Sequence, residues 1–357
     1  MTHDFLIIGG GIAGISAAAR LAPLGSVLLL EAETNLAYHA SARSAALYEP
    51  RYGNPAVVAL SLASDAEFQA SGTLSPRGLM IVDAPDQQAR FEAHAEAFEL
   101  TPLSIPEAQA LFPILNPETV GFAAHAPHAW DIDTDLLIQT YLREARAHGA
   151  EIRSGAPVTQ ITRQPQRWEV IAGGEAHQAR IVFNAAGAWA DPIAELAGIA
   201  PKGVQPLRRS MARLPAPGGR DTSHWPMVIG GNEDWYCKPD AGALIVSPAE
   251  EDLTEPHDAW ADDMVLAEGL ARYEEMVTEP VTRLLASWAG LRSFAPDRAP
   301  LLGPDPADPT FYWIAGQGGY GFQTCPAASA LIADLVAGRP GDLPPETRHA
   351  VAPSRFG

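Results

Sequence analysis

The segment HDFLIIGGGIAGISAAARLAPLGSVLLLE, residues 3–31, decides the fold of this chain. Residues 3–8 are a short apolar run typical of a buried strand, and the alanine-rich residues 12–22 predict a helix. Residues 26–31 predict a second buried strand. Strand, helix and strand within about 30 residues form a β-α-β unit, so we expect an α/β fold with a parallel sheet.

Three glycines between the first strand and the helix have the spacing G-x-G-x-x-G. Gly9 permits a tight turn, Gly11 lets the backbone approach a pyrophosphate, and Gly14 allows the helix to pack closely on the strand. The N-terminus of the helix directs free N–H groups and the positive end of its dipole toward the phosphates. Glu31, at the end of the second strand, can accept hydrogen bonds from a ribose. These features predict dinucleotide binding; the alternative is a structural glycine turn without a ligand.

The β-α-β unit alone does not distinguish FAD from a nicotinamide cofactor. A nicotinamide enzyme usually keeps its dinucleotide-binding domain contiguous, whereas here the α/β pattern stops near residue 35. It returns at 134–200, which begins with a predicted amphipathic helix at 134–150 that has Thr134 as its N-cap. It returns again at 310–338, where residues 326–336 predict a helix. This discontinuity favours FAD, bound by segments from the whole chain.

Length, charge and cysteine content narrow the class of protein. A chain of 357 residues suggests two domains, and a net charge of −19 disfavours binding to nucleic acid or to anionic membranes. Cys237 and Cys325 lie far apart in the sequence, which argues against a disulfide framework and a thiolate zinc site. The sequence contains no signal-peptide pattern and no apolar run of transmembrane length. We therefore expect a cytoplasmic protein without a transmembrane segment, free or peripheral at the inner face of a membrane.

Two further glycine-containing segments are suited to close contact with a ligand. NAAGAWAD, residues 184–191, ends a predicted strand in small residues; the alternative is a plain β-α turn. GQGGYGFQT, residues 316–324, precedes a helix, and its N–H groups would stabilise negative charge on a reduced flavin; the alternative is a flexible surface loop.

His125 and His128 lie near acids, but loop histidines on a surface are commoner than metal ligands, so no metal site is expected.

The chain resembles the D-amino-acid oxidase family of FAD-dependent oxidoreductases, which includes glycine oxidase, sarcosine oxidase and D-amino acid dehydrogenases. Within this family it is most similar to the bacterial D-arginine dehydrogenases. The resemblance covers nearly the whole chain and is carried by the ordered segments IIGGGIAG (7–14), YHASARSAALYEPRYG (38–53), DIDTD (131–135), NAAGAW (184–189), RRS (208–210), WYCKPDAG (235–242), WAGLRSF (288–294) and QGGYGFQT (317–324).

The resemblance implies a Rossmann-like FAD-binding domain and an α+β substrate domain with a mixed or antiparallel sheet. The FAD-binding domain would comprise residues 1–50, 134–200 and 296–357, and the substrate domain would comprise residues 51–133 and 201–295. The absence of a cysteine after GLRSF implies that the FAD is bound noncovalently.

The resemblance, together with the glycine motifs, predicts which residues contact FAD. Ala13 and Glu31 fall at phosphate and ribose positions, and the backbone of Val158 falls at the adenine. The full set of expected FAD-binding residues is Gly9, Gly11, Ala13, Gly14, Glu31, Ala40, Ser41, Arg43, Ser44, Ala45, Ala46, Val158, Ala186, Gly187, Gly316, Gly319, Tyr320, Gly321, Gln323 and Thr324.

The resemblance also implies a site for an amino acid. Arg209 and Arg292 match arginines that bind the substrate carboxylate, a planar group that a guanidinium grips through two hydrogen bonds. Without the resemblance, we would expect Arg292 to form a surface ion pair, and we would expect Tyr52 and Tyr236 to be core residues. The full set of expected substrate-site residues is Leu47, Tyr48, Tyr52, Leu79, Arg209, Tyr236, Arg292, Gln317 and Gly318.

Two positions depart from the D-arginine dehydrogenases. Leu79 stands where those enzymes place a glutamate that pairs with the substrate guanidinium, and Leu47 stands where a histidine is expected. A leucine-lined pocket favours a neutral or apolar side chain. In the segment 39–53, the small residues would lie against the flavin, while LYEPRYG would form a mobile lid that carries Tyr52 over the substrate.

We interpret the chain as an FAD-dependent D-amino acid dehydrogenase or oxidase. Hydride would pass from Cα to flavin N5, and water would hydrolyse the imino acid to a 2-oxo acid and ammonia. The alternatives are a glycine- or sarcosine-type secondary amine oxidase, a nicotinamide-dependent dehydrogenase and a noncatalytic flavoprotein that binds a partner. The sequence is equally compatible with a quinone, an electron-transfer protein or O2 as the electron acceptor.

Overall fold

The glycine-rich segment folds as the sequence predicts. In the computed structural model, which describes residues 2–356, it forms β1 (Thr2–Ile8), α1 (Ile12–Leu21) and β2 (Val27–Leu30). The two strands pair in parallel, and every residue of β2 is buried. The small residues of α1, among them Ala17 and Ala18, are fully buried and allow the helix to lie close to the sheet.

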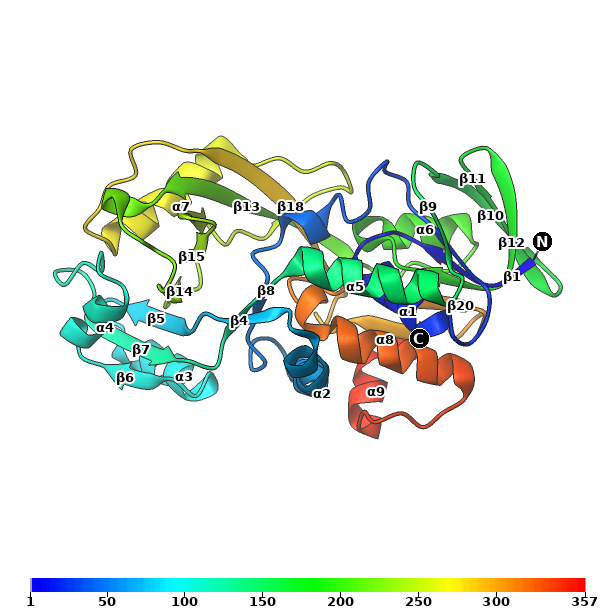
Figure 1. The fold of residues 1–357 in the computed structure, drawn as a ribbon, viewed down its shortest axis with the longest axis horizontal. Coiled ribbons are helices and arrows are strands. Elements are labelled where there is room, and N and C mark those ends of the chain that lie inside the picture. Colours follow the sequence, from blue (N-terminus) through cyan, green and yellow to red (C-terminus); the bar gives the residue numbers. More distant parts are fainter. Residues whose placement is uncertain (1, 357) are drawn as a thin grey trace.

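β1 belongs to an eight-stranded sheet (Figure 1). The parallel part has the order β20-β12-β1-β2-β9, while β10 and β11 extend the sheet in antiparallel fashion beside β12 and β19 pairs with β20. The additional strands are β9 (Glu151–Arg153), β10 (Val158–Gln164), β11 (Arg167–Ala172), β12 (Glu175–Asn184), β19 (Leu301–Pro304) and β20 (Phe311–Ala315). Segments far apart in the chain therefore build one sheet, as the discontinuous α/β pattern predicts.

Both faces of this sheet are covered. Ile7 and Leu29 pack with the helices of one face, whereas Leu6 and Leu28 point the other way and pack with Trp168, because successive side chains of a strand alternate between faces. The helices of the first face are α1, α5 (Thr134–Ala147) and α8 (Gly321–Ala337), and α6 (Ala190–Leu196) lies on the second.

A second, nine-stranded sheet lies at the other end of the molecule (Figure 1). It is mixed, since β5 pairs with β14 in parallel and the other pairs are antiparallel. Its strands are β5 (Leu79–Asp83), β6 (Thr101–Leu103), β7 (Phe122–Ala126), β13 (Gln205–Pro215), β14 (Met227–Gly230), β15 (Tyr236–Asp240), β16 (Ala243–Ser247), β17 (Asp252–Leu253) and β18 (Ala286–Phe294), and its helices are α3 (Gln88–Ala97), α4 (Ile105–Leu111) and α7 (Asp263–Glu275). The predicted fold class, α/β with a mixed second sheet, is confirmed.

The expected domain boundary at residue 51 does not fit the packing of α2 (Pro55–Ser71). This helix shares a hydrophobic core with α1, α5 and α8, and the Ser64 hydroxyl accepts a hydrogen bond of 3.1 Å from the backbone N–H of Ala327. A small sheet of β3 (Leu47–Tyr48), β8 (Trp130–Ile132) and β4 (Leu74–Pro76) connects this helix to the second sheet. The first part of the expected substrate domain is thus packed on the FAD-binding domain.

Two predicted helix ends are wrong. α8 begins at Gly321 instead of residue 326, because burial of Phe322 and its neighbours against the sheet outweighs the low helix propensity of glycine and proline. α5 is capped by Asp133, whose carboxylate accepts a hydrogen bond from the N–H of Leu136, so that Thr134 is the first helical residue.

The close contact of α1 with β1 can be tested at Gly14. A Cβ at this position would lie 2.0 Å from the carbonyl oxygen of Gly9. We expect Gly14→Ala to displace α1 and to lower the free energy of unfolding by about 3 kcal/mol, measured by chemical denaturation. Gly72→Ala is the control, since its Cβ would meet no atom within 4 Å and its positive φ predicts a loss of about 1 kcal/mol. Equal stability of the two variants would contradict the close contact.

Candidate active site

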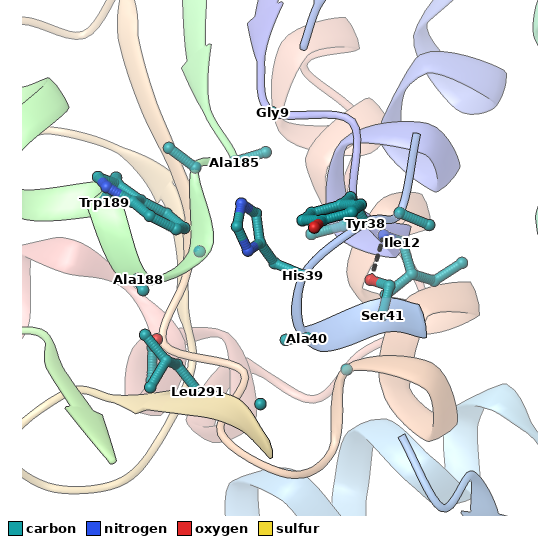
Figure 2. Close-up of a pocket in the computed structure, with 18 of the residues that line it drawn as sticks. Gly9, Ile12, Tyr38, His39, Ala40, Ser41, Ala185, Ala188, Trp189 and Leu291 are labelled. Carbon is teal, nitrogen blue, oxygen red and sulfur yellow. Dashed lines mark hydrogen bonds between the residues drawn. The ribbon is translucent and has the colours of Figure 1, made fainter. Parts of the chain in front are cut away.

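A cavity of about 470 Å³ extends along the carboxyl end of the parallel strands to the junction of the two large sheets. Its wall is built by the β1–α1 turn, the segment 37–45, the end of β12, the strands β13 and β18, and the glycine loop before α8. Ligands of open α/β sheets bind at this end of the strands. Figure 2 shows Gly9, Ser41, Ala185 and Trp189 around this opening.

The β1–α1 turn faces the cavity as the glycine spacing predicts. Gly9 has a φ of 111°, and a Cβ there would lie 2.3 Å from the carbonyl oxygen of Ala185 on the neighbouring strand. The Glu31 carboxylate accepts hydrogen bonds from the N–H groups of Gly10 at 2.6 Å and Glu33 at 2.8 Å. Glu31 is therefore fixed beside the turn, with its side chain in the cavity wall.

The segment after β2 closes over the N-terminus of α1. Ala40–Arg43 form a short 3-10 helix, and the Ser41 hydroxyl accepts a hydrogen bond of 3.0 Å from the N–H of Ile12 (Figure 2). Arg43 donates from Nη1 to the carbonyl oxygens of Ala259 at 2.8 Å and Ala289 at 2.9 Å. The Arg43 guanidinium thus ties this segment to the second sheet and is occupied by protein groups.

An aromatic pair that sequence reasoning missed also lines the cavity and connects this segment with the end of β12. The His39 ring packs against Trp189 with 4.7 Å between ring centroids, and His39 Nε2 lies 3.0 Å from a Glu33 carboxylate oxygen (Figure 2). Trp189 lies two residues after Gly187, and the predicted residues Ala186 and Gly187 do line the cavity. A large aromatic residue next to a glycine turn was the available signal.

Two buried polar side chains in the cavity wall lack a partner. Within the described chain, Ser293 Oγ and Gln317 Nε2 are both buried and have no hydrogen-bond partner. Their segments are held side by side, since the N–H of Gly318 donates to the Ser293 carbonyl oxygen at 2.8 Å. Buried polar groups are usually satisfied, so these two point to a polar ligand. Together with the close-approaching glycine turn, they fit a flavin dinucleotide.

Two arginines come to this cavity from adjacent strands of the second sheet. Arg209 on β13 pairs with Gly290 on β18, which places Arg209 diagonally opposite Arg292. Arg209 donates to the Glu250 carbonyl oxygen at 2.8 Å and lies 3.2 Å from a Glu251 carboxylate oxygen. Burial and the like charge of Arg292 lower the pKa of Arg209. The Arg292 side chain makes no hydrogen bond or ion pair with residues 2–356, although both arginines line the cavity.

The predicted apolar residues lie together beside the arginines, although they are not among the residues that line the cavity. Leu47, Leu79, Tyr52 and Tyr236 belong to one hydrophobic cluster, which also contains the cavity-lining Met211. The Tyr236 hydroxyl donates to the Met211 sulfur at 3.4 Å, and burial raises the pKa of Tyr52. Residues from five separate strands and loops thus meet at one place. The predicted Tyr320 also lies here, with its ring 5.4 Å from that of Tyr52.

Three more predicted site residues do not line the cavity and lie behind its wall. Tyr48 is fully buried, and its hydroxyl donates to the Ser61 carbonyl oxygen at 3.0 Å and to Asp65 at 3.1 Å, so it is a core tyrosine. Gln323 donates to the Tyr52 carbonyl oxygen at 3.2 Å, and Thr324 donates to the Tyr320 carbonyl oxygen at 2.8 Å. All three serve the packing of the segments that form the wall. The resemblance had implied ligand contacts for them, and their burial is not visible in the sequence.

Most of the other predicted residues do line the cavity. These are Gly9, Gly11, Ala13, Glu31, Ala40, Ser41, Arg43, Ser44, Ala45, Val158, Ala186, Gly187, Arg209, Arg292, Gln317, Gly318, Gly319 and Gly321. Gly14, Ala46 and Gly316 lie next to it and shape the backbone; Gly316 has a φ of 70° and Ala46 a φ of 50°.

Comparison with protein families identifies the fold and its cofactor. Residues 4–335 match the model of the DAO family, which is described as FAD dependent oxidoreductase. The chain belongs to this family. It is an FAD-dependent oxidoreductase, which removes the nicotinamide alternative, and the cavity accommodates the family's cofactor.

The relatives of this family member are distant in sequence. The bovine FAD-dependent oxidoreductase domain-containing protein 1 is 26% identical, over 93% of this chain and 81% of the relative. Rat mitochondrial dimethylglycine dehydrogenase is 24% identical, and the match spans 99% of this chain but only 45% of the rat enzyme. These relatives agree with the family assignment, whereas the finer resemblance to D-arginine dehydrogenases stays a prediction.

Solved structures share the fold over nearly the whole chain. L-proline dehydrogenase from P. horikoshii has a TM-score of 0.86 at 21% identity and covers 99% of this chain and 98% of its own. Glycine oxidase from Geobacillus kaustophilus has a TM-score of 0.82 at 22% identity, with 96% of both chains covered. Iminodiacetate oxidase from Chelativorans sp. BNC1 has a TM-score of 0.82 at 25% identity, with 98% of both chains covered.

Residues 2–356 contain neither a membrane-spanning helix nor a cluster of metal-binding side chains. Across residues 2–356, no helix combines the length and the apolar composition needed to cross a bilayer. In the same range, no three His, Cys, Asp or Glu side chains are grouped as a metal ion requires. His128 Nε2 lies 3.1 Å from the Phe98 carbonyl oxygen.

The position of Glu31 generates a prediction about FAD affinity. Its carboxylate is held beside the phosphate-binding turn, where it can accept hydrogen bonds from a ribose. We expect Glu31→Gln to raise the dissociation constant of FAD about tenfold, because a hydrogen bond to a charged acceptor is replaced by a neutral one. Fluorescence titration of the apoprotein with FAD measures the change. Glu151→Gln, at an exposed site on β9, should bind FAD like the unmodified protein; an unchanged affinity of Glu31→Gln would remove Glu31 from the site.

Proposed function

We propose that this FAD-dependent oxidoreductase oxidises the Cα–N bond of a D-amino acid with a neutral or apolar side chain. The product would be an imino acid, which water hydrolyses to a 2-oxo acid and ammonia. The observation that carries the proposal is the unpaired guanidinium of Arg292 in the cavity wall, beside an apolar cluster. A cation without a protein counterion in a largely buried place calls for an anionic ligand.

The chain's own residues supply binding and orientation. Arg292 would bind the substrate carboxylate, and Arg209, held by the Glu250 carbonyl oxygen, would support the same end of the substrate. A carboxylate fixed at this point fixes the direction of the Cα–H bond, and such orientation contributes several kcal/mol to catalysis, on the order of 7–11 at best. Bound FAD supplies the hydride acceptor, and this family cofactor would be held noncovalently.

The apolar cluster supports the choice of side chain. Leu47 and Leu79 replace polar residues of the D-arginine dehydrogenases, and the structure brings both leucines to Tyr52 and Tyr236. A cationic side chain placed here would lose its hydration without gaining a carboxylate partner. A neutral or apolar side chain gains roughly 0.8 kcal/mol for each buried methylene instead.

A second candidate function is the oxidation of a secondary amine of the glycine or sarcosine type. It is favoured by the relatives, which include a glycine oxidase and a dimethylglycine dehydrogenase. Anaerobic mixing of the purified yellow protein with D-amino acids, L-amino acids and N-methylglycine separates the two candidates. Bleaching of the flavin by neutral D-amino acids alone supports the proposal, and bleaching by N-methylglycine alone supports the alternative.

The role of Arg292 is tested by Arg292→Met, which keeps the volume and removes the charge. We expect kcat/KM for the best D-amino acid to fall by about 100-fold or more, with a large rise in KM, because the substrate carboxylate loses a charged donor. Steady-state kinetics measure the loss. Arg213→Met is the matched control on the paired strand β13, where the guanidinium pairs with Asp240 outside the cavity. Near-normal kinetics of Arg292→Met would exclude Arg292 from substrate binding.

The substrate preference is tested at Leu79. We expect Leu79→Glu to raise the ratio of kcat/KM for D-arginine to that for D-leucine about tenfold, because the new carboxylate can pair with a cationic side chain. Leu79→Gln, which has the same size without the charge, controls for the loss of apolar surface. If both variants show the same ratio, the side chain at position 79 does not contact the substrate side chain.

A further inference from the structure

Glu49 is a buried acid in the segment that carries Tyr52. Its exposed fraction is 2%, and within residues 2–356 its Oε2 has no hydrogen-bond partner. The other carboxylate oxygen accepts a hydrogen bond of 3.0 Å from the N–H of Arg51. Burial raises the pKa of Glu49 from 4.5 to about 7, against the opposing effect of Arg51. A neutral carboxyl group therefore suits this place better than a carboxylate does.

Few charged groups face Glu49 from the elements around it. His128 is the nearest, with Nε2 3.7 Å from Glu49 Oε2. Arg51, on the same turn, is paired with the exposed Glu99 at 2.8 Å. Tyr48 precedes it, and the Tyr48 hydroxyl is directed away to Asp65 on α2. α8 contributes the neutral Gln323. Ionisation of Glu49 is thus poorly compensated by its surroundings.

The turn around Glu49 is coupled to Tyr52 by a chain of contacts. The N–H of Tyr52 donates to the Glu49 carbonyl oxygen at 3.1 Å. Gln323 accepts from the N–H of Glu49 at 3.4 Å and donates to the Tyr52 carbonyl oxygen at 3.2 Å. His128 reaches the Phe98 carbonyl oxygen at 3.1 Å, and the Phe98 ring stacks on that of Tyr52 with 6.0 Å between centroids.

We infer that Glu49 is a positioning residue for Tyr52. When Glu49 is protonated, Tyr52 is held beside the arginines of the proposed substrate site, and when Glu49 is ionised, the turn 49–52 loosens. The inference rests on the proposed function, in which Tyr52 lines the substrate site. Glu49 does not touch the cavity; it acts through the turn that it shares with Tyr52 and through His128 and Phe98. Substrate binding would consequently depend on a proton outside the site.

The titration of Glu49 is tested with the FAD-loaded protein and the variants Glu49→Gln and Glu99→Gln. Since the folded protein holds the Glu49 proton more tightly than the unfolded chain, unmodified protein loses stability as the pH rises from about 4.5 through about 7. Glu49→Gln lacks this loss, so its melting temperature should rise relative to unmodified protein by about 3 °C or more between pH values of about 5.5 and about 8.5. Glu99→Gln, the exposed matched control, should keep the loss.

Coupling to Tyr52 is read by amide hydrogen exchange and by ligand binding. Over the same pH range, exchange of residues 49–53, corrected for its intrinsic pH dependence, should accelerate about fivefold in unmodified protein and not in Glu49→Gln. Benzoate, a carboxylate that does not titrate in this range, should lose about fivefold in affinity with unmodified protein and none with Glu49→Gln, followed by the flavin absorbance.

The outcomes separate the inference from the proposed function. The inference is overturned if the melting temperature has the same pH dependence in unmodified protein and in Glu49→Gln. It is also overturned if amide exchange of residues 49–53 has the same pH dependence in both proteins. If the pH dependence of amide exchange differs between the two proteins but benzoate does not bind, the proposed carboxylate site is overturned. The role of Glu49 in the turn is then still supported. If benzoate binding has the same pH dependence in both proteins, the coupling of Glu49 to the proposed substrate site is overturned.

Discussion

The structure depends on the close approach of helix α1 to strand β1. Gly14 permits the helix to sit where any side chain would meet the carbonyl oxygen of Gly9, and Gly9 in turn fits under the carbonyl oxygen of Ala185. This approach directs the N-terminus of α1 into the cavity and sets the place of Ser41, whose hydroxyl caps the N–H of Ile12. The phosphate end of the cofactor site follows from these backbone contacts alone.

The proposed substrate end depends on strand pairing in the second sheet. β13 and β18 are long antiparallel partners, and they bring Arg209 and Arg292 from the second sheet to the edge of the first. Strand pairing fixes the diagonal arrangement of the two arginines, so their orientation does not rely on a flexible loop. Arg43 reinforces the junction from the other side by bonding to the carbonyl oxygens of Ala259 and Ala289.

Local sequence rules predicted the parts of the site that depend on backbone geometry. The glycine turn and Glu31 could be predicted because their spacing reports the turn, the helix start and the strand end directly. The arginines were found only through the family resemblance, since nothing local distinguishes Arg292 from a surface arginine. Tyr48, the start of α8 and the packing of α2 were mispredicted because each depends on burial against segments distant in sequence. His39 and Trp189 were missed for the same reason, since they meet only in the folded chain.

The interleaving of the two sheets has a consequence for synthesis of the chain on the ribosome. The first sheet begins with β1 but requires β12 and finally β20, which ends at Ala315. The strands of the second sheet end earlier, at Phe294. The N-terminal β-α-β unit therefore emerges first, while the sheet that it starts is completed last. During translation, β1 and β2 wait for β9 and β12, which are made about half a chain later, and β20 joins β12 only after that. Because the glycine loop after β20 also lines the cavity, the cofactor site is among the last features that the nascent protein can form.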